Sequence, residues 1–289
     1  MKITEYPSVS EVNNSTVFII DGDNGTKKIT ADDLRYALFN DIPEMHRNIF
    51  RGKPLGSSFT TEQKTAVQNG TFDDLWIGDY WTINGIDYVI ADMDYFYGKG
   101  IHDSVTQGFQ THHLVIVPRN QMYKDKYDDS MENYNGSYIR TTGLNNAKTT
   151  ITNAFSSNII SFPDLLINSI GDSSVSRSSI WVYNCTVELL SEYMVFGTLY
   201  LSVMNGALTL FNSSSAIISN MNCDQIAIFR LCPSFIKSRH STDSTSTSSW
   251  WLRDNGYSGR ASMVGANGNS SVTINISKTA GVRPFFCIG

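Results

Sequence analysis

The C-terminal stretch Trp250–Gly289 decides the fold; it reads WWLRDNGYSGRASMVGANGNSSVTINISKTAGVRPFFCIG. It begins with two tryptophans, continues through a segment rich in Gly, Asn and Ser, and ends in the apolar run Val282–Ile288. Large aromatic side chains dominate protein cores, so at least one tryptophan is expected inside. The polar segment between the two apolar ends is the part expected to carry function.

The middle of this stretch predicts a β-hairpin, because Asn267–Gly268 suits a type I′ turn, which needs positive φ at both central residues. A two-residue turn pairs Ala266 with Asn269, Met263 with Val272 and Ala261 with Ile274. One face is then apolar and packs, and the other is polar and faces outward. The predicted ligand-contact residues are Trp250, Tyr257, Arg260, Ser262, Asn267, Thr273 and Asn275, with Trp250 as either a core anchor or a stacking platform for a sugar.

A second hairpin is predicted upstream, where Asn84–Gly85 separates two apolar alternations. Its register sets Ile83 opposite Ile86 and Trp81 opposite Tyr88, and a further strand is expected over His113–Val117, ended by Pro118. Thr60–Gln63 predicts a capping box for a helix that stops at Gly70. Residues 171–230 are expected to be rich in strands, including Ile226–Phe229, and His240–Ser249 is expected to be a flexible loop.

The clearest helix is predicted over Leu144–Phe155, with Leu144, Ala147, Ile151 and Phe155 on one stripe. Thr142 or Asn145 is its expected cap. A second helix is expected over Ser161–Ile170, starting near Pro163.

The N-terminal residues 1–40 are expected to form a separate small unit, with strands at Val17–Ile20 and Thr26–Ile29 and a helix after the capping residue Thr30. Residues 41–71 are expected to be a connector with a short helix, and residues 72–289 the main domain. The fold class predicted is α+β.

Composition excludes several function classes. The net charge is −5 and no Lys/Arg cluster occurs, which disfavours nucleic-acid binding. No run reaches the length of a membrane span and the N-terminus lacks a signal-peptide core, so a protein made in a cytoplasm is expected, without membrane insertion. Cys185, Cys223, Cys232 and Cys287 show no metal-ligand spacing and are expected to be buried free thiols. No metal, cofactor or catalytic residue is predicted. His112 and His113 point to opposite faces of a strand, and Arg283 is expected to be structural.

A family resemblance follows from particular residues. Trp250–Arg253 and Gly281–Pro284 resemble the conserved ends of an uncharacterised bacterial and phage domain family, which is related to the formylglycine-generating-enzyme and C-type-lectin-like fold. Trp76–Tyr80, Leu189–Gly197, Ile228–Arg230 and Ser234–Ile236 resemble further parts of it. The resemblance implies a C-type-lectin-like domain over residues 72–289. The copper-binding cysteine pair of the enzymes has no match near Cys232 or Cys287, so an enzyme is not predicted.

The same fold displays ligand-binding segments in phage receptor-binding proteins, and Tyr257–Asn275 occupies the corresponding place. Lys2–Thr30 resembles the start of phage structural proteins, typically fibres, which implies a virion-attachment segment. The leading hypothesis is therefore a homotrimeric phage fibre or tail-tip protein of the virion that binds a host surface ligand, with a glycan as one candidate. Two alternatives remain: a head fibre or decoration protein with an architectural role, and an enzyme that modifies a surface polymer.

Overall fold

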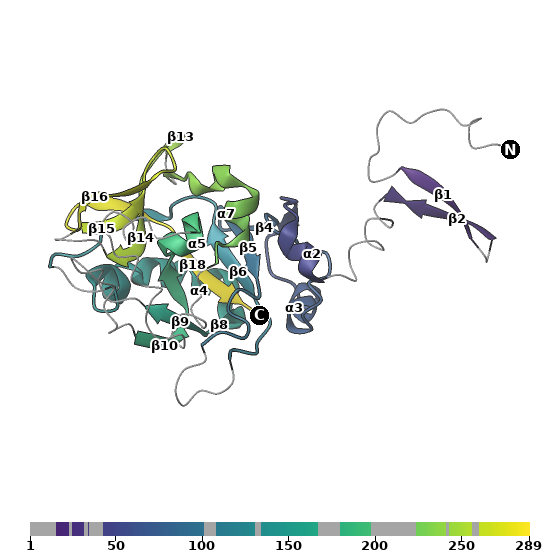
Figure 1. The fold of residues 1–289 in the computed structure, drawn as a ribbon, viewed down its shortest axis with the longest axis horizontal. Coiled ribbons are helices and arrows are strands. Elements are labelled where there is room, and N and C mark those ends of the chain that lie inside the picture. Colours follow the sequence, from purple (N-terminus) through teal and green to yellow (C-terminus); the bar gives the residue numbers. More distant parts are fainter. Residues whose placement is uncertain are drawn as a thin grey trace, which may run out of the picture.

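The computed structural model describes residues 16–22, 25–31, 34, 43–100, 108–130, 134–166, 180–197, 224–240, 243–255 and 260–289, and the statements below concern these residues. They form a mixed α+β structure, mostly sheet with short helices (Figure 1). The predicted fold class is confirmed at this level. The helices are α2 (Pro43–Asn48), α3 (Thr61–Gln68), α4 (Asn145–Phe155), α5 (Glu192–Phe196) and α7 (Ala227–Leu231), with a π-helical turn η2 (Ile139–Gly143) and 3-10 turns η3 (Ser156–Asn158) and η5 (Pro233–Ile236).

A seven-stranded sheet forms the centre of the body. Its order is β11-β18-β6-β5-β4-β3, and β8 also pairs with β18. The strands are β3 (Pro54–Gly56), β4 (Tyr80–Ile83), β5 (Ile86–Met93), β6 (Leu114–Pro118), β8 (Ile159–Ile160), β11 (Val187–Leu189) and β18 (Pro284–Ile288). The Phe155 ring of α4 packs edge to face on Tyr88, with ring centroids 5.1 Å apart, and lies tilted against Phe286, also at 5.1 Å. Such contacts join segments distant in sequence into one core.

The hairpin of β4 and β5 has the predicted register, with Ile83 opposite Ile86 and Trp81 opposite Tyr88. Asn84 and Gly85 have φ angles of 50° and 78°, as the type I′ turn requires. The strand predicted to end at Pro118 is β6. The capping box at Thr60 and Gln63 is also confirmed, and Gly70 follows the helix with a φ of 70°.

Helix α4 buries Ala147, Ile151 and Phe155 as predicted, but the predicted cap is wrong. Its N-cap residue is Leu144, which makes no side-chain capping bond, because the π-helical turn η2 runs directly into the helix. The η2 turn continues the helical backbone in front of α4, so a side-chain cap is not needed at the start of the helix.

Three local predictions are wrong because tertiary partners override local sequence preference. Ser161–Ile170 does not start a helix; its described part contains strand β9 (Phe162–Leu166), paired with β10 (Ile180–Cys185). Ile226–Phe229 is not a strand, since α7 begins there and Asp92 accepts a hydrogen bond of 2.9 Å from the Ala227 N–H. The expected loop after His240 contains β13 (Asp243–Thr247), which pairs with β12 (Arg239–His240).

A five-stranded sheet, of order β16-β15-β14-β17-β7, contains the C-terminal hairpin. Its strands are β7 (Tyr123–Lys126), β14 (Trp250–Asn255), β15 (Arg260–Val264), β16 (Ser270–Asn275) and β17 (Thr279–Val282). Ala261 lies opposite Ile274 as predicted, but Met263 lies opposite Ser271 rather than Val272, because the register shifts between the two pairs. Ala266 and Asn269 lie in the turn and do not form a strand pair. Strand β18 follows β17 after a single residue, Arg283, so this residue links the two sheets.

The N-terminal hairpin of β1 (Val17–Gly22) and β2 (Gly25–Thr30) is confirmed, with Val17 opposite Thr30. Figure 1 shows it set apart from the body that starts at α2. Most of the helix predicted after Thr30 lies outside the described residues, as do residues 198–223 of the segment expected to be rich in strands, including Cys223.

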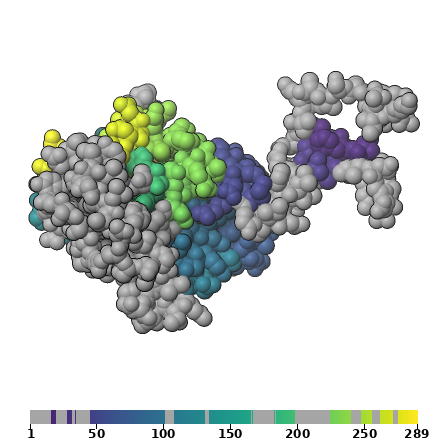
Figure 2. All heavy atoms as spheres, viewed as in Figure 1, coloured from purple at the N-terminus to yellow at the C-terminus, as the bar shows by residue number. Residues whose placement is uncertain are grey.

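The described part of the connector expected over residues 41–71 is built into the body. Strand β3 pairs with β4, Phe50 bridges to Ile77, and the Trp81 Nε1–H donates to Gln63 Oε1 at 3.0 Å. Arg230 of α7 donates to Asn48 at the end of α2 (3.2 Å), where the two helices meet on the surface in Figure 2. Within the described residues, α2, β3 and α3 therefore pack with the body.

Candidate functional site

The two tryptophans that open the C-terminal stretch are both fully buried. The Trp250 Nε1–H donates to the Ile236 carbonyl (3.1 Å), and the Trp251 Nε1–H donates to the Asp125 carbonyl (2.8 Å). The core role predicted for at least one of them holds for both. Trp250 is inaccessible to a ligand, so its alternative role as a stacking platform is corrected.

Arg283 is fully buried beside Trp250, as the structural role predicted for it requires. Its Nε–H donates to the Pro118 carbonyl (2.9 Å) and its Nη1 to the Phe235 carbonyl (2.8 Å). The guanidinium carbon lies 4.5 Å from the centre of the Phe235 ring and 5.1 Å from that of Trp250. Burial lowers the pKa of Arg283 to about 9. The aromatic rings and carbonyls stabilise this cation and fix the junction between the sheets.

Arg253 on β14 forms a buried ion pair with Asp164 on β9, and its Nη2 lies 3.1 Å from Asp164 Oδ1. The Arg253 carbonyl also accepts a hydrogen bond of 2.7 Å from the Tyr127 hydroxyl. Both charged side chains are nearly inaccessible to solvent. This pair therefore joins β14, the strand next to the C-terminal hairpin, to β9.

Ser262 is fully buried, which corrects its predicted place on an exposed polar face. Its Oγ donates to Glu192 Oε1, and Ser270 Oγ donates to the same oxygen at 3.2 Å. The Glu192 backbone N–H donates to Asp254 Oδ2 (2.6 Å), and burial raises the pKa of Asp254 against the effect of Arg253. Strand β15 is buried on both faces because α5 covers the one expected to be polar. Ser262 thus holds the hairpin in place.

The turn of the hairpin is exposed. The Gly265 N–H donates to the Asn269 carbonyl (2.7 Å) and the Gly268 N–H to the Gly265 carbonyl (2.8 Å). Asn267 and Asn269 are exposed in this turn. Asn275 is exposed at the other end of β16, where its Oδ1 accepts hydrogen bonds from the Ser277 N–H (3.0 Å) and Oγ (2.9 Å).

The structure brings only some of the predicted contact residues together. Arg260 and Thr273 have described backbone positions on β15 and β16, with Arg260 opposite Asn275, but their side chains lie outside the described atoms. Tyr257 lies outside the described residues. Asn267 lies in the turn, whereas Arg260 and Asn275 lie at the opposite end of the same two strands. These two ends of the β15–β16 hairpin are hereafter called the hairpin surface.

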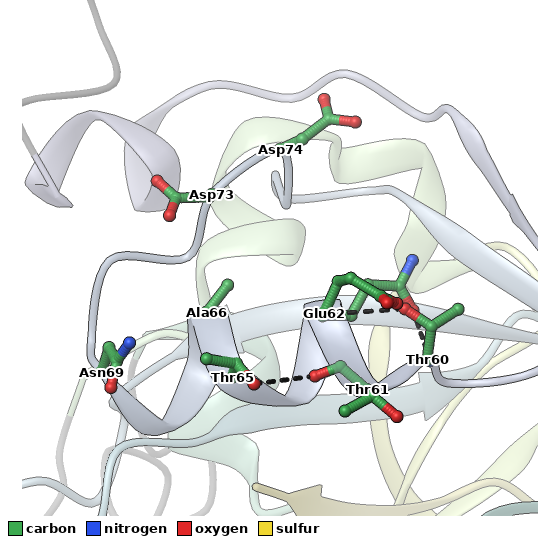
Figure 3. A pocket seen from close by; sticks show the side chains of 9 residues that line it. Thr60, Thr61, Glu62, Thr65, Ala66, Asn69, Asp73 and Asp74 are labelled. Carbon is green, nitrogen blue, oxygen red and sulfur yellow. Dashed lines mark hydrogen bonds between the residues drawn. The ribbon is translucent and has the colours of Figure 1, made fainter.

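A hollow of about 700 Å³ lies beside α3, far in sequence from the hairpin surface (Figure 3). Asp73 and Asp74 lie on a loop across from the helix (Figure 3). The pKa of Glu62 is lowered by hydrogen bonds that its carboxylate accepts from the Glu62 backbone N–H and from the Thr60 side chain. Burial raises the pKa of Asp74, but hydrogen bonds from Lys53 and Arg51 outweigh it and lower the pKa overall. The lining residues are Thr60, Thr61, Glu62, Gln63, Thr65, Ala66, Asn69, Asp73 and Asp74.

The chemistry of this hollow is that of hydroxyls, amides and ionised carboxylates. Asp74 is already held by Arg51 (2.5 Å) and Lys53 (2.7 Å). Sequence reasoning did not identify it, because its residues come from a capping box and a loop whose local patterns predict only a helix start. The available signal was the acidic pair Asp73–Asp74 shortly after that helix.

The adjacent histidines differ in burial, but the prediction that they lie on opposite faces of a strand is wrong. Both precede β6, and Asp94 contacts both, with its Oδ1 3.7 Å from the His113 Nδ1. His113 is buried, and burial lowers its pKa to about 4. His112 is partly exposed, and its Nδ1 lies 2.7 Å from Asp94 Oδ2. The Tyr97 ring stacks on His112 with centroids 4.7 Å apart. Within the described residues, no three His, Cys, Asp or Glu side chains are grouped to hold a metal ion.

Cys185 and Cys287 are buried free thiols, and Cys232 is a half-buried one. Burial raises the pKa of both buried thiols, so they stay protonated. In the part of the chain that the structure describes, no helix is long and apolar enough to cross a membrane.

A comparison with protein families finds a match between residues 186–289 and a domain of unknown function, DUF6273. The match covers a little over a third of the chain and includes α5, α7, the hairpin surface and Arg283. No curated protein and no solved structure matches the chain. Within the seven-stranded sheet, the matched segment supplies only β11 and β18, so it shares one core with residues outside the match. The chain is thus similar to this family over its C-terminal part.

Proposed function

We propose that the protein is a bacteriophage virion component, a fibre or tail-tip protein, that binds a host surface ligand through the hairpin surface. The observation that carries the proposal is the contrast between an exposed polar turn and the buried groups beneath it. Asn267 and Asn269 are exposed, whereas Ser262 and Trp250 below them are fully buried. Binding residues commonly lie on loops that a rigid scaffold positions.

The N-terminal hairpin supports the attachment half of the proposal. Val17 and Ile19 on β1 are 51% and 62% exposed. A two-stranded hairpin is marginally stable in water unless a further surface covers its apolar side. Attachment of this hairpin to other virion proteins, with homotrimer formation, would cover these side chains and place the hairpin surface away from the particle.

The C-type-lectin-like fold remains part of this proposal. It rests on the resemblance of Trp250–Arg253 and Gly281–Pro284, which the structure makes buried scaffold residues. A scaffold of this kind tolerates change in the exposed segment between them, because the buried groups keep their partners. The ligand is proposed to be a host surface glycan or protein.

The test introduces Arg260→Ala and Tyr257→Ala together in the full chain. Binding of the fluorescently labelled variant to host cells is then compared with that of the labelled unchanged protein. Binding is expected to fall by about tenfold or more, as expected for interface hot spots enriched in Tyr and Arg. Arg230→Ala, an exposed arginine on α7, is the control and is expected to leave binding unchanged. Unchanged binding by a folded double variant rules out the end of the hairpin surface that carries Arg260, and Asn267→Ala in the same assay tests the turn.

Location on the virion is tested separately by immunogold electron microscopy of particles with antibody against the full chain. Label at the distal end of tail structures supports the proposal. Label on the capsid favours a head fibre or decoration protein, in which the same domain has an architectural role.

A further inference from the structure

A buried histidine, His113, holds the turn that follows β5, which is called here the Phe96 turn (residues 94–99). The Phe96 N–H donates to His113 Nε2 at 3.1 Å. On the other side of the ring, His113 Nδ1 lies 2.8 Å from the Thr111 carbonyl oxygen. A carbonyl oxygen only accepts and a backbone N–H only donates, so the ring carries its proton on Nδ1 and a lone pair on Nε2. Both contacts therefore require the neutral imidazole.

The surroundings of His113 disfavour a positive charge. The side chain is fully buried. The Phe96 ring lies tilted against it, with centroids 5.9 Å apart, and the Phe109 ring meets it edge-on at 5.4 Å. Burial is the main reason that the pKa of His113 is lowered to about 4. A proton added to Nε2 also removes the acceptor for the Phe96 N–H, because a protonated ring has two donors and no acceptor.

The charged and titratable groups that face His113 among the described residues are Asp94, His112 and Arg47. Asp94 Oδ1 lies 3.7 Å from His113 Nδ1 and favours the protonated ring. This oxygen already accepts from the His113 backbone N–H (2.9 Å), and Asp94 Oδ2 lies 2.7 Å from His112 Nδ1. His112 and Arg47 oppose the charge, and Arg47 is paired with the buried Asp92. The neighbours therefore do not reverse the effect of burial.

The two ends of the Phe96 turn have unusual backbone. Asp94 has a φ of 52°, in the left-handed region where a residue other than glycine is strained. Gly98 has a φ of 72°, and its N–H donates to the Phe109 carbonyl at 2.7 Å. A Cβ on Gly108 would lie 2.3 Å from the Gly98 carbonyl, so the two chains meet where only glycine fits. These ends can absorb a local opening while β5 and β6 keep their pairing.

We propose that His113 is an acid-sensitive switch: its protonation releases the Phe96 turn while the central sheet stays folded. The ring takes up a proton more readily in the opened turn, where water replaces the rings of Phe96 and Phe109 around it. The part of the closed turn's stability that depends on His113 is complete above pH 6.5 and is lost as pH falls from 6.5 to about 4. The switch lies beside β5 and β6, so it does not depend on what the hairpin surface binds.

The test follows hydrogen exchange in the full-length protein by NMR and divides each amide's rate by its intrinsic rate. The amides of Phe96, Gly98 and Phe109 report on the turn. Ile116 on β6, which lies between β5 and β18, reports on the central sheet. From about pH 7.5 to about pH 5.5, opening of the turn is expected to increase about tenfold, from pKa values of 6.5 when open and about 4 when closed. Opening at Ile116 is expected to change by less than about twofold.

Two glutamine variants assign the proton to one histidine. His113→Gln offers the Phe96 N–H a side-chain oxygen that does not titrate, so the increase is expected to disappear. His112→Gln is the matched control, because it removes the partly exposed neighbour that contacts the same Asp94. The increase is expected to remain in that variant. If His113→Gln does not fold, the pH profile of the unchanged protein decides, since opening should then increase from pH 6.5 downward and level off near 4.

Four results overturn the proposal. They are an increase in opening that begins only below about pH 4.5, the range of ordinary carboxyl groups, an equal increase at Ile116, an increase that persists in His113→Gln, and its loss in His112→Gln.

Discussion

The molecule contains two hairpins whose turns carry the same Asn-Gly signal, and only one of them forms the predicted turn. In the β4–β5 hairpin, Asn84 and Gly85 both have positive φ, and every strand pair falls in the predicted register. In the β15–β16 hairpin, Gly268 has a φ of 83° but Asn267 is outside the left-handed region. The signal gives the place of a turn, whereas the register depends on what the strands pack against.

The support beneath the two hairpins explains this difference. The β4–β5 hairpin rests on apolar contacts, in which Trp81 and Tyr88 meet Phe155 edge to face. The β15–β16 hairpin rests on buried polar groups, with Ser262 and Ser270 both bonded to Glu192. Alternation of apolar and polar residues predicts a register only where burial follows alternation. Where a polar residue such as Ser262 is buried together with its hydrogen-bond acceptor Glu192, alternation no longer predicts which side chains are buried.

The largest effect is expected when the two hairpins are separated by expressing residues 186–289 alone. This segment matches DUF6273, but its β18 pairs with β6 and its β17 pairs with β7, both outside it. We expect no cooperative unfolding transition, because the unpaired strands and their apolar faces are then exposed. Chemical denaturation followed by tryptophan fluorescence measures this, with residues 43–289 as the control. A cooperative transition in the short segment would show that it is an independent domain.

The second-largest effect is expected when the buried ion pair between Arg253 and Asp164, beside the C-terminal hairpin, is removed. Arg253→Met leaves Asp164 buried without its cation, and the free energy of unfolding is expected to fall by about 3–5 kcal/mol. Urea denaturation measures the change. Adding Asp164→Leu to the same variant is expected to recover part of the loss, because no unpaired charge remains. Arg230→Met, on the surface, is expected to change stability by less than about 0.5 kcal/mol. An equally small effect of Arg253→Met would contradict a structural role for the pair.

Sequence patterns predicted the elements whose stability is mostly local. The capping box at Thr60, the stripe of α4 and the β4–β5 register all depend on residues close together in the chain. The patterns failed where distant partners decide: Asp164 favours a strand at β9 by pairing with Arg253, and Asp92 caps α7 from β5. Neither partner is recognisable from spacing.

The sequence predicted only part of the candidate site, because distant partners decide the rest of it. The turn at Asn267 was located by its dipeptide. The buried positions of Trp250 and Ser262 depend on η5 and α5, which cover them from other parts of the chain. The hollow beside α3 combines a helix start with a loop that local patterns treat separately.

A smaller effect tests the two turns directly. Asn84→Ala is expected to lower the free energy of unfolding by about 1 kcal/mol, because alanine is strained in the left-handed region that Asn tolerates. Asn267→Ala, the matched change, is expected to cost less than about 0.5 kcal/mol. Both residues are exposed, so lost packing does not confuse the comparison. Thermal and urea denaturation measure both variants, and equal losses would mean that the two turns are alike.

The smallest effect at neutral pH concerns the hydroxyl of Tyr88, which is buried without a hydrogen-bond partner among the described residues. Tyr88→Phe removes this unpaired group, and a gain of up to about 1 kcal/mol is expected. Burial raises the pKa of Tyr88 from 10.0 to about 12. The unfolded chain therefore loses this proton first, so the stability tied to Tyr88 is complete below pH 10 and is lost as pH rises through about 12.

Urea denaturation of both proteins from pH 8 to pH 11.5 (roughly the span around the ordinary tyrosine pKa) measures this dependence. The other buried tyrosines are common to both, so the difference between the curves isolates Tyr88. The advantage of Tyr88→Phe should be constant below pH 10 and grow above it. A difference that stays flat would mean that water reaches the Tyr88 hydroxyl, and the apolar support of the β4–β5 hairpin would then be less complete than the packing around Phe155 implies.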